Sequence, residues 1–176
     1  MRLIGLSGWS GSGKTTLLTR LIPALIGRGR SVSTIKHAHH AFDVDRPGKD
    51  SYVHREAGAR EVLISSERRW ALMHEHRGAP EPALPELLSH LGPVDLVLIE
   101  GFKREAHAKI EIHRAAVGKP LLYPHDPQIV AIASDPPLPE APIPHIDLND
   151  IEAIADLVEQ LAVEVDRVAW DRARED

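Results

Sequence analysis

The sequence predicts a single α/β domain in which helices flank a mostly parallel β-sheet. Apolar runs of strand length alternate with stretches of helical spacing along the chain. The 176 residues provide room for one domain rather than two. Hydrophobic residues make up 43 % of the chain and charged residues 27 %, which is typical of a globular protein.

The chain begins with a strand, a helix and a second strand. Residues 2–7 form a short apolar run that leads into glycine, as in a buried strand entering a tight turn. Leu17, Leu21 and Leu25 follow at helical spacing, and Gly27 provides a stop signal. Residues 31–36 are rich in β-branched side chains and predict the second strand. Because such a unit is almost always right-handed, it predicts a parallel pair of strands.

Further strands follow a polar stretch over residues 37–60. They are expected at residues 61–65, 70–74, 95–100, 109–113 and 128–133. The apolar run at 95–100 predicts a fully buried strand. The alternation of polar and apolar residues at 109–113 instead predicts a strand exposed on one face or placed at an edge.

Two more helices are expected in the second half of the chain. Residues 80–91 start with proline and predict one of them. The other is expected over residues 149–170, where Asn149 and Glu152 form a candidate capping box before an apolar stripe. Between these helices, eight of the 14 prolines fall in residues 120–144, so this segment is expected to be mostly irregular.

Charge and composition exclude several classes of protein. Lys and Arg number 21 against 26 Asp and Glu, and the net charge of −5 argues against binding to nucleic acid or anionic membrane by general attraction. The absence of cysteine excludes disulfides, thiolate metal sites and cysteine catalysis. The apolar stretch at residues 3–6 is too short for a signal peptide, and no run approaches a membrane span. We therefore expect a cytoplasmic protein.

The turn after the first strand carries the strongest motif. Residues 8–15 fit the pattern G-x-x-x-x-G-K-[ST], with a strand before and a helix after, and this context is typical of a phosphate-binding loop (P-loop). Its backbone N–H groups and the helix N-terminus favour phosphate oxygens. The expected nucleotide-binding residues of the loop are Gly8, Ser10, Gly11, Ser12, Gly13, Lys14, Thr15 and Thr16. The motif predicts a P-loop NTPase-like fold, with residues 1–176 forming one nucleotide-binding domain.

Within this site, Lys14 and Thr15 have distinct expected roles. The Lys14 ammonium is expected to reach the β- and γ-phosphates, and the Thr15 hydroxyl to bind Mg²⁺. A carboxylate is expected at the carboxyl end of a neighbouring parallel strand, because ligands of open α/β sheets bind there. Glu100 lies at that end of the 95–100 strand and Asp95 at the other. Glu100 is therefore predicted to contact the metal or its water, and Asp95 to start the strand.

The polar stretch after the second strand offers a possible switch segment. Asp43 and Asp45 are candidate catalytic residues that contact the Mg²⁺ shell or orient water. Two alternatives stay open. The stretch is a solvated polar loop, or its carboxylates and histidines, including His39 and His40, form a dedicated metal site.

Base recognition is the weakest part of the pattern. The chain lacks the N-K-x-D segment that guanine-specific domains commonly use. Asp135 follows the 128–133 strand, where a carboxylate would accept hydrogen bonds from guanine N1–H and N2–H₂. The alternative is an Asp that only introduces Pro136 in a turn.

Three separated motifs together resemble the MobB family of P-loop accessory proteins of molybdopterin-guanine dinucleotide biosynthesis. They are residues 5–17, the His/Asp/Pro-Gly-Lys-Asp-Ser block within residues 35–59, and residues 98–103. The block is the discriminating motif, since many families share the P-loop. The resemblance covers about residues 2–135. It implies GTP binding with weak Mg²⁺-dependent hydrolysis and a homodimer. It also implies cooperation with the MobA-like guanylyltransferase that joins GMP to molybdopterin; molybdopterin and its molybdenum-insertion protein are further candidate partners.

A small-molecule kinase is the alternative function. It would share the P-loop but need an acceptor pocket and a lid bearing arginines over the phosphates. Arg68, Arg69 and Arg77 are the mid-chain candidates for such a lid, and they flank a predicted strand rather than a helical flap. This placement favours the accessory protein.

Overall fold

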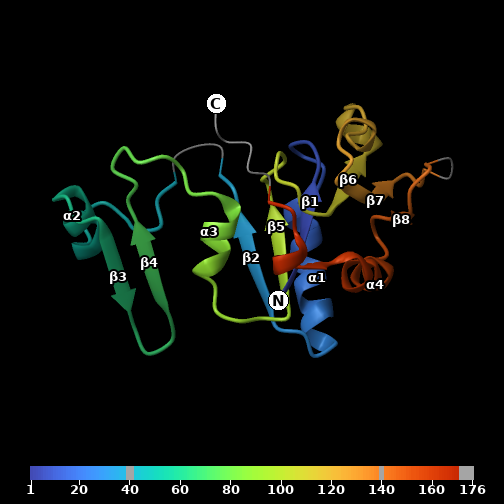
Figure 1. Cartoon of the computed structure of the whole chain (residues 1–176). Helices are drawn as coiled ribbons and strands as arrows, with labels where there is room; N and C mark the ends of the chain where they lie inside the picture. Colours follow the sequence, from blue (N-terminus) through green and yellow to red (C-terminus); the bar gives the residue numbers. More distant parts are fainter. Residues whose placement is uncertain (39–41, 139–140, 171–176) are drawn as a thin grey trace. The chain divides into compact units, whose positions relative to one another are not determined.

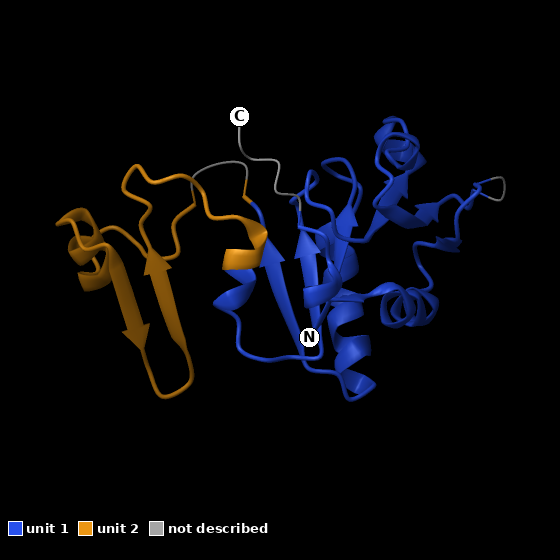
Figure 2. Ribbon diagram, in the orientation of Figure 1, with its two compact units in different colours: residues 1–37, 87–176 blue, residues 38–86 orange. Residues whose placement is uncertain are grey.

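The computed structural model describes residues 1–38, 42–138 and 141–170. The chain divides into two compact units, residues 1–37 with 87–176 and residues 38–86 (Figure 2). Each unit is described by itself below. One domain over residues 1–176 stays a prediction.

The first unit contains a seven-stranded sheet with the order β2-β5-β1-β6-β7-β8 and with β9 beside β1 (Figure 1). The strands are β1 (Arg2–Ser7), β2 (Val32–Lys36), β5 (Leu96–Glu100), β6 (Lys109–Arg114), β7 (Ile129–Asp135), β8 (His145–Asp147) and β9 (Val163–Glu164). Every pair is parallel except β1 with β9. The predicted mostly parallel sheet flanked by helices is confirmed.

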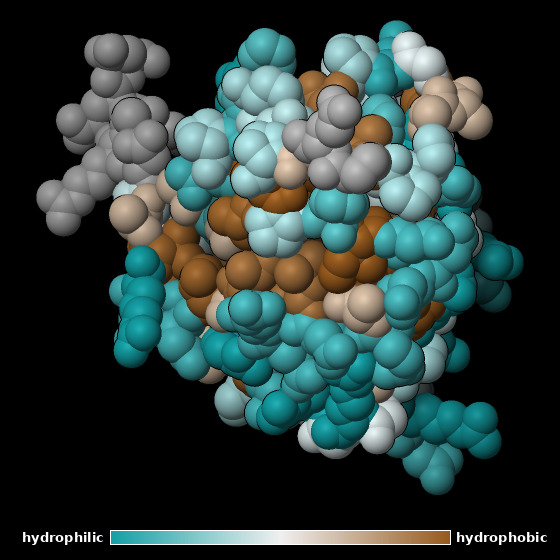
Figure 3. All heavy atoms as spheres, turned by 90° about the vertical axis from the view of Figure 1, so that its right-hand side faces the viewer, coloured by the Kyte–Doolittle hydropathy of each residue, from teal (hydrophilic) through white to brown (hydrophobic). Residues whose placement is uncertain are grey.

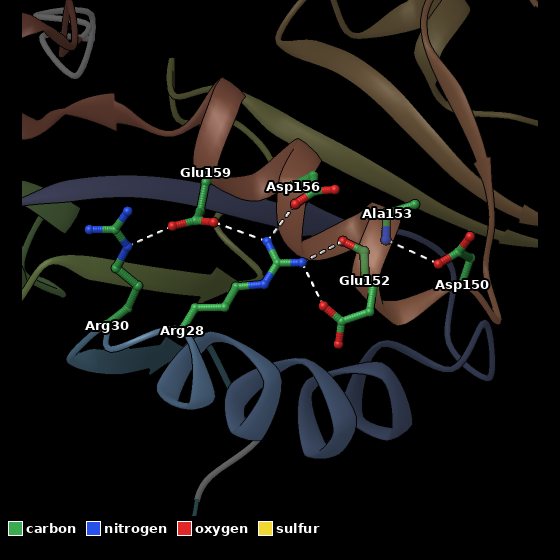
Figure 4. Close-up of polar contacts among 7 residues, drawn as sticks. All are labelled: Arg28, Arg30, Asp150, Glu152, Ala153, Asp156 and Glu159. Atoms are coloured by element: carbon green, nitrogen blue, oxygen red, sulfur yellow. Dashed lines mark hydrogen bonds and ion pairs between the residues drawn. The ribbon is translucent and has the colours of Figure 1, made fainter.

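Two helices cover one face of this sheet. They are α1 (Lys14–Gly27) and α4 (Ile151–Leu161), and their buried side chains join those of β1, β5, β6 and β7 in one apolar core cluster. At their outer surface, Arg28 from the end of α1 contacts Glu152, Asp156 and Glu159 of α4 (Figure 4). Burial of apolar area therefore holds α1 and α4 on the sheet. The ion pairs of Arg28 form a polar rim at the solvent side of this core.

The C-terminal helix is shorter than the expected 149–170. Asp150 rather than Asn149 caps it, accepting a hydrogen bond from the Ala153 N–H at 3.0 Å, and the helix ends at Leu161. The chain then pairs as β9 with the start of β1, a stretch of β1 that β6 does not reach. Strand pairing there overrides the apolar stripe, and Val165 begins a 3₁₀ turn, η3 (Val165–Arg167).

The 109–113 strand is not at an edge, contrary to the alternation in its sequence. As β6 it lies between β1 and β7, and its polar residues Lys109 and Glu111 are buried. Both side chains are hydrogen-bonded to loop segments. This pairing removes the cost of burying them and lets a polar pattern occupy the middle of the sheet.

Irregular segments separate the later strands. The stretch 120–144 contains η2 (Tyr123–His125) and β7, and η1 (Ala115–Val117) precedes it. The helix expected at 80–91 is shorter, α3 (Leu84–Ser89), and the boundary of the two units falls inside it.

The second unit consists of α2 (Asp50–Glu56) and an antiparallel hairpin of β3 (Glu61–Ser65) and β4 (Trp70–His74). Both strands have the bounds expected from the sequence. The Arg55 side chain lies at the centre of an acidic cluster, with Asp43 and Asp45 each at 3.0 Å and Glu56 and Glu75 each at 3.6 Å. This cluster ties the loop before α2 to α2 itself.

The surface of the molecule is mixed in polarity. Seen from the side on which β8 and α4 lie, hydrophobic residues gather in a band across the middle with hydrophilic residues above and below it (Figure 3). None of the helices in the described part of the chain combines the length and the apolar character that crossing a membrane requires.

Candidate functional site

The P-loop closes the carboxyl end of β1 and starts α1. Gly13 has a φ of +95° at the residue before the helix, a left-handed conformation that glycine adopts without strain. The first N–H groups of α1 lack intrahelical partners and are available for an anion. A cavity of about 390 Å³ lies beside them.

Most of the predicted phosphate-binding residues line this cavity. Its lining is Ser10, Gly11, Gly13, Lys14, Thr15, Thr16, Lys36 and Glu100. Gly8 and Ser12 belong to the same loop but do not line the cavity, and both are buried. The P-loop and Glu100, which lie 85 residues or more apart in the sequence, are therefore brought together as expected.

Glu100 reaches the cavity because β5 lies directly beside β1. Leu6 of β1 is the register partner of Glu100, and the P-loop begins two residues later, at Gly8. Asp95 begins the same strand segment at the opposite end, where its carboxylate accepts hydrogen bonds from the N–H (2.8 Å) and hydroxyl (2.7 Å) of Ser31. These bonds from Ser31 lower the pKa of Asp95. Glu100 therefore lines the cavity and Asp95 does not, and the metal role of Glu100 stays a prediction.

The cavity is electropositive. Lys14 donates hydrogen bonds from Nζ to the carbonyl oxygens of Gly8 at 2.8 Å and Trp9 at 2.9 Å. Burial lowers the pKa of Lys14, the Glu100 carboxylate opposes this, and the ammonium groups of Lys103 and Lys36 lower it further. Three cationic side chains thus act on the same space, which suits a polyphosphate.

The donor set at this edge fits a magnesium ion. The Thr15 hydroxyl and Glu100 carboxylate are oxygen ligands, and Mg²⁺ commonly takes one or two protein ligands together with phosphates and water. Within residues 1–38, 42–138 and 141–170, no group of three or more His, Asp or Glu side chains could hold a metal by itself. His39 and His40 of the alternative metal site lie outside the described residues.

The other predicted site residues are not among the residues that line the cavity. Asp43 and Asp45 belong to the second unit, where Arg55 holds both carboxylates. Asp135 ends β7, and its Oδ2 accepts a hydrogen bond from Arg114 Nη1 at 3.0 Å. Among the candidate lid arginines, Arg77 donates hydrogen bonds to the backbone carbonyls of Arg55 and Ala59 within the second unit.

Two residues of the site were not predicted to take part. Lys36 ends β2 and lines the cavity. Arg114 ends β6, and a Cβ added at Gly13 would lie 3.2 Å from its Nε, so the guanidinium lies against the P-loop. Their position at carboxyl ends of strands was the available signal, but it does not say which strands are neighbours.

Trp9 of the P-loop connects two loops of the first unit. Its indole Nε1–H donates to the Pro120 carbonyl at 2.8 Å. The ammonium groups of Lys103 and Lys119 lie 5.6 and 5.8 Å from the ring centroid, within the range of cation–π attraction. The P-loop is thus braced by the segments that follow β5 and β6.

The chain is similar to known proteins over most of its length. A family model described as MobB, molybdopterin guanine dinucleotide synthesis protein B, matches residues 3–135. A molybdopterin-guanine dinucleotide biosynthesis adapter protein of Escherichia coli is 46 % identical over 159 residues, covering 89 % of this chain and 90 % of that protein. The adapter protein of Haemophilus influenzae is 45 % identical over 161 residues, covering 89 % and 87 %.

A solved structure shows the same fold. The crystal structure of molybdopterin-guanine biosynthesis protein B superposes with a TM-score of 0.72 at 27 % identity, covering 90 % of this chain and 99 % of that one. The similarity therefore extends beyond the P-loop to 90 % of this chain.

Proposed function

The chain belongs to the MobB family, and from this premise we propose that it binds GTP with Mg²⁺ at the P-loop and presents the loaded state to a guanylyltransferase. Its broader role is that of an adapter protein in molybdopterin-guanine dinucleotide biosynthesis. The observation that carries the proposal is the cavity in which the P-loop, Lys14 and Glu100 meet.

Nucleotide binding is tested by Lys14→Ala. The Lys14 ammonium is placed to leave the carbonyls of Gly8 and Trp9 and bind the β- and γ-phosphates. Loss of a charge-assisted hydrogen bond should weaken GTP binding about ten- to a hundredfold, and GDP binding less. Calorimetric titration measures both. Equal losses for the two nucleotides would contradict the placement of Lys14.

Weak hydrolysis is the expected activity. Arg55 holds the Asp43 and Asp45 carboxylates, so either would have to leave an ion pair to orient water, which favours slow turnover. Glu100→Gln should abolish Mg²⁺-stimulated phosphate release, whereas Asp95→Asn at the other end of β5 should leave it nearly intact. The reverse pattern in a steady-state assay would contradict the role of Glu100. Rapid phosphate transfer to a small-molecule acceptor would support a kinase instead.

Guanine preference rests on the family and on Asp135. Arg114 holds Oδ2 of Asp135, which fixes the carboxylate and leaves Oδ1 to accept from a base. In a competition experiment, ATP should displace labelled GTP poorly. Displacement on equal terms would remove the proposed role of Asp135.

A homodimer is supported by the hairpin of the second unit. Leu63 and Leu72 are cross-strand partners, Trp70 lies on the same face, and all three are exposed. An isolated two-stranded hairpin is at best marginally stable in water, so this apolar face suits a second copy of the chain. Leu72→Lys should shift the sedimentation coefficient to that of a monomer, and Ser66→Lys in the hairpin turn serves as the control. An unchanged dimer in L72K, or a monomeric wild type, would contradict this interface.

Partner recognition is proposed to depend on the loaded state. Segments beside a bound γ-phosphate and Mg²⁺ commonly become ordered, and the stretch 37–60 leaves the carboxyl end of β2. GTP with Mg²⁺ should protect this stretch from protease and strengthen capture of a molybdopterin guanylyltransferase. Unchanged cleavage and nucleotide-independent capture would leave a constitutive scaffold.

A further inference from the structure

One cationic side chain of the phosphate cavity comes from outside the P-loop. Lys36 is the last residue of β2, and its register partner is Glu100, the last residue of β5. Lys36 Nζ lies 3.9 Å from Glu100 Oε2. The same two side chains line the cavity together with Lys14. The parallel register therefore places a lysine directly beside the carboxylate proposed to meet the metal.

The ion pair between Lys36 and Glu100 is weak. The Lys36 side chain is 63 % exposed and the Glu100 side chain 14 %, and their separation is at the outer limit of an ion pair. A pair whose lysine is this exposed and this distant contributes little stability, because water screens the ammonium and the long lysine stem loses entropy when held. The flexible four-carbon stem also lets the ammonium move several ångströms without a change in the backbone.

The favoured position of the Lys36 ammonium differs between the metal-free site and the Mg²⁺-bound site, because the uncompensated negative charge differs. Without metal, Glu100 is the one carboxylate among the described residues that line the cavity, and it would repel a polyphosphate unless a cation compensates it. With Mg²⁺ bound, Glu100 is already compensated, and the γ-phosphate becomes the uncompensated anion. Lys36 also lies close enough to Lys14 for the two ammonium groups to repel each other, which favours an anion between them.

We propose that Lys36 is a second phosphate lysine that distinguishes triphosphate from diphosphate: it neutralises Glu100 in the metal-free site and contacts the γ-phosphate in the metal-loaded site. This inference rests on the proposed nucleotide binding and names the residue that makes it selective. The position of the Lys36 side chain then depends on whether triphosphate is bound. Lys36 is the last residue of β2, and the second unit, residues 38–86, begins two residues later.

Calorimetric titration of GTP and GDP, each with Mg²⁺ and with EDTA, tests the proposal. With Mg²⁺, Lys36→Gln should lose about tenfold in GTP affinity with little change for GDP, since one charge-assisted contact to the γ-phosphate is lost. Lys36→Arg keeps the charge and should retain most of the selectivity. Arg20→Gln removes an equal charge from an exposed position of α1 without lining the cavity, and should leave the GTP/GDP ratio unchanged.

A second variant separates the two positions of Lys36. In EDTA, Lys36→Gln leaves Glu100 uncompensated and should weaken GTP binding, and adding Glu100→Gln should restore it. With Mg²⁺, the same second substitution should restore nothing, because the missing contact is to the phosphate. Thermal melts confirm that the variants are folded.

The outcomes distinguish this inference from the proposed function. A wild-type chain that binds neither nucleotide overturns the proposed function itself. Intact wild-type binding with an unchanged GTP/GDP ratio in Lys36→Gln overturns only the role of Lys36. An equal loss in Arg20→Gln would show a general electrostatic field in place of a specific contact, and would also overturn it.

Discussion

The two faces of the central sheet are covered by different means. On one face, Ile4 and Leu6 of β1 pack with apolar side chains of α1 and α4. Side chains alternate between faces along a strand, so Lys109 and Glu111 of β6 point to the opposite face from Ile110 and Ile112 of the helix-covered core. On that opposite face, the segments that Lys109 and Glu111 contact are loops, and we call it the loop-covered face.

Buried polar side chains hold these loops. Lys109 Nζ donates to the carbonyls of Lys103 and Glu105 at 2.9 and 2.8 Å and lies 3.1 Å from Asp126 Oδ2. The Glu111 carboxylate accepts from the N–H groups of Leu122 and Tyr123 at 2.8 and 2.9 Å. A loop has no repeating apolar stripe to bury, so directional bonds fix it instead. At β6, therefore, the helix-covered face is held by apolar packing and the loop-covered face by hydrogen bonds from buried polar side chains.

The largest expected difference in the free energy of unfolding is between methionine introduced at Lys109, on the loop-covered face, and methionine introduced at Leu21, on the helix-covered face. Lys109→Met leaves two carbonyls and the Asp126 carboxylate without their shared donor, and should cost about 3–5 kcal/mol. Leu21→Met in α1 conserves volume and polarity, and should cost less than about 1.5 kcal/mol. Urea denaturation at pH 7 measures both through the midpoint at constant slope. Similar losses for the two variants would mean that the faces are not held differently.

Acid should weaken the loop-covered face first. His107 is fully buried, and neither ring nitrogen has a hydrogen-bond partner among the described residues. It packs so closely on β1 that a Cβ added at Gly5 would lie 2.5 Å from His107 Nε2. Burial lowers the pKa of His107 from 6.5 to about 4, the Lys109 ammonium adds to this, and Asp126 opposes it.

The sign of the pH effect follows from this lowered pKa. Below pH 6.5 the unfolded chain binds a proton that folded His107 does not, so the free energy of unfolding falls as pH drops from 6.5 toward about 4. The total loss is about 3 kcal/mol, at about 1.4 kcal/mol per pH unit. His107→Phe should remove this slope in denaturation at pH 5–7. His125→Phe, in the exposed η2 turn, is the control, and an unchanged slope in H107F would contradict the assignment.

The difference between the faces also decides what the sequence predicts. The strands β1 and β5 and the helix α1 could be recognised because a continuous apolar run or a helical stripe reports burial directly. The position of β6 could not, because Lys109 and Glu111 find partners in segments 4 to 17 residues away whose conformation is irregular. The pairing of β9 with β1 joins the two ends of the chain, and local pattern carries no signal for it.

The candidate site divides in the same way. The P-loop residues and Glu100 could be predicted, since motif and strand polarity together place them at one edge of the sheet. Lys36 and Arg114 could not be assigned, because their roles depend on sheet order: β2 beside β5, and β6 beside β1. Asp43 and Asp45 were predicted because their polar stretch follows the second strand, but their ion pairs with Arg55 depend on α2 folding against their loop, which the pattern does not report.

The smallest effect is expected at the polar rim of the helix-covered face. Arg28 Nη1 lies 2.6 Å from Asp156 and 3.0 Å from Glu159, and Nη2 lies 2.6 Å from Glu152 (Figure 4). Glu152 and Asp156 are each 74 % exposed, so water and salt screen these pairs. Arg28→Gln should therefore lower the melting temperature slightly at low salt and have almost no effect at high salt. A large loss that salt does not change would mean that the ion pairs, rather than packing, attach α4 to α1.

The ion pairs between α1 and α4 should weaken at a lower pH than the loop-covered face does. Hydrogen bonds from Arg30 and Arg28 lower the pKa of Glu159 below its ordinary value of 4.5. Its contribution is fully present above pH 4.5 and is lost as pH falls through the lower folded value. The rim should thus stay intact at pH 5.5, where the loop-covered face has already begun to weaken through His107. Hydrogen exchange at pH 5.5 and 7 should then show increased opening in residues 101–108 and unchanged protection in α1 and α4. Equal loosening of the helices at pH 5.5 would show that the two faces respond to acid as one.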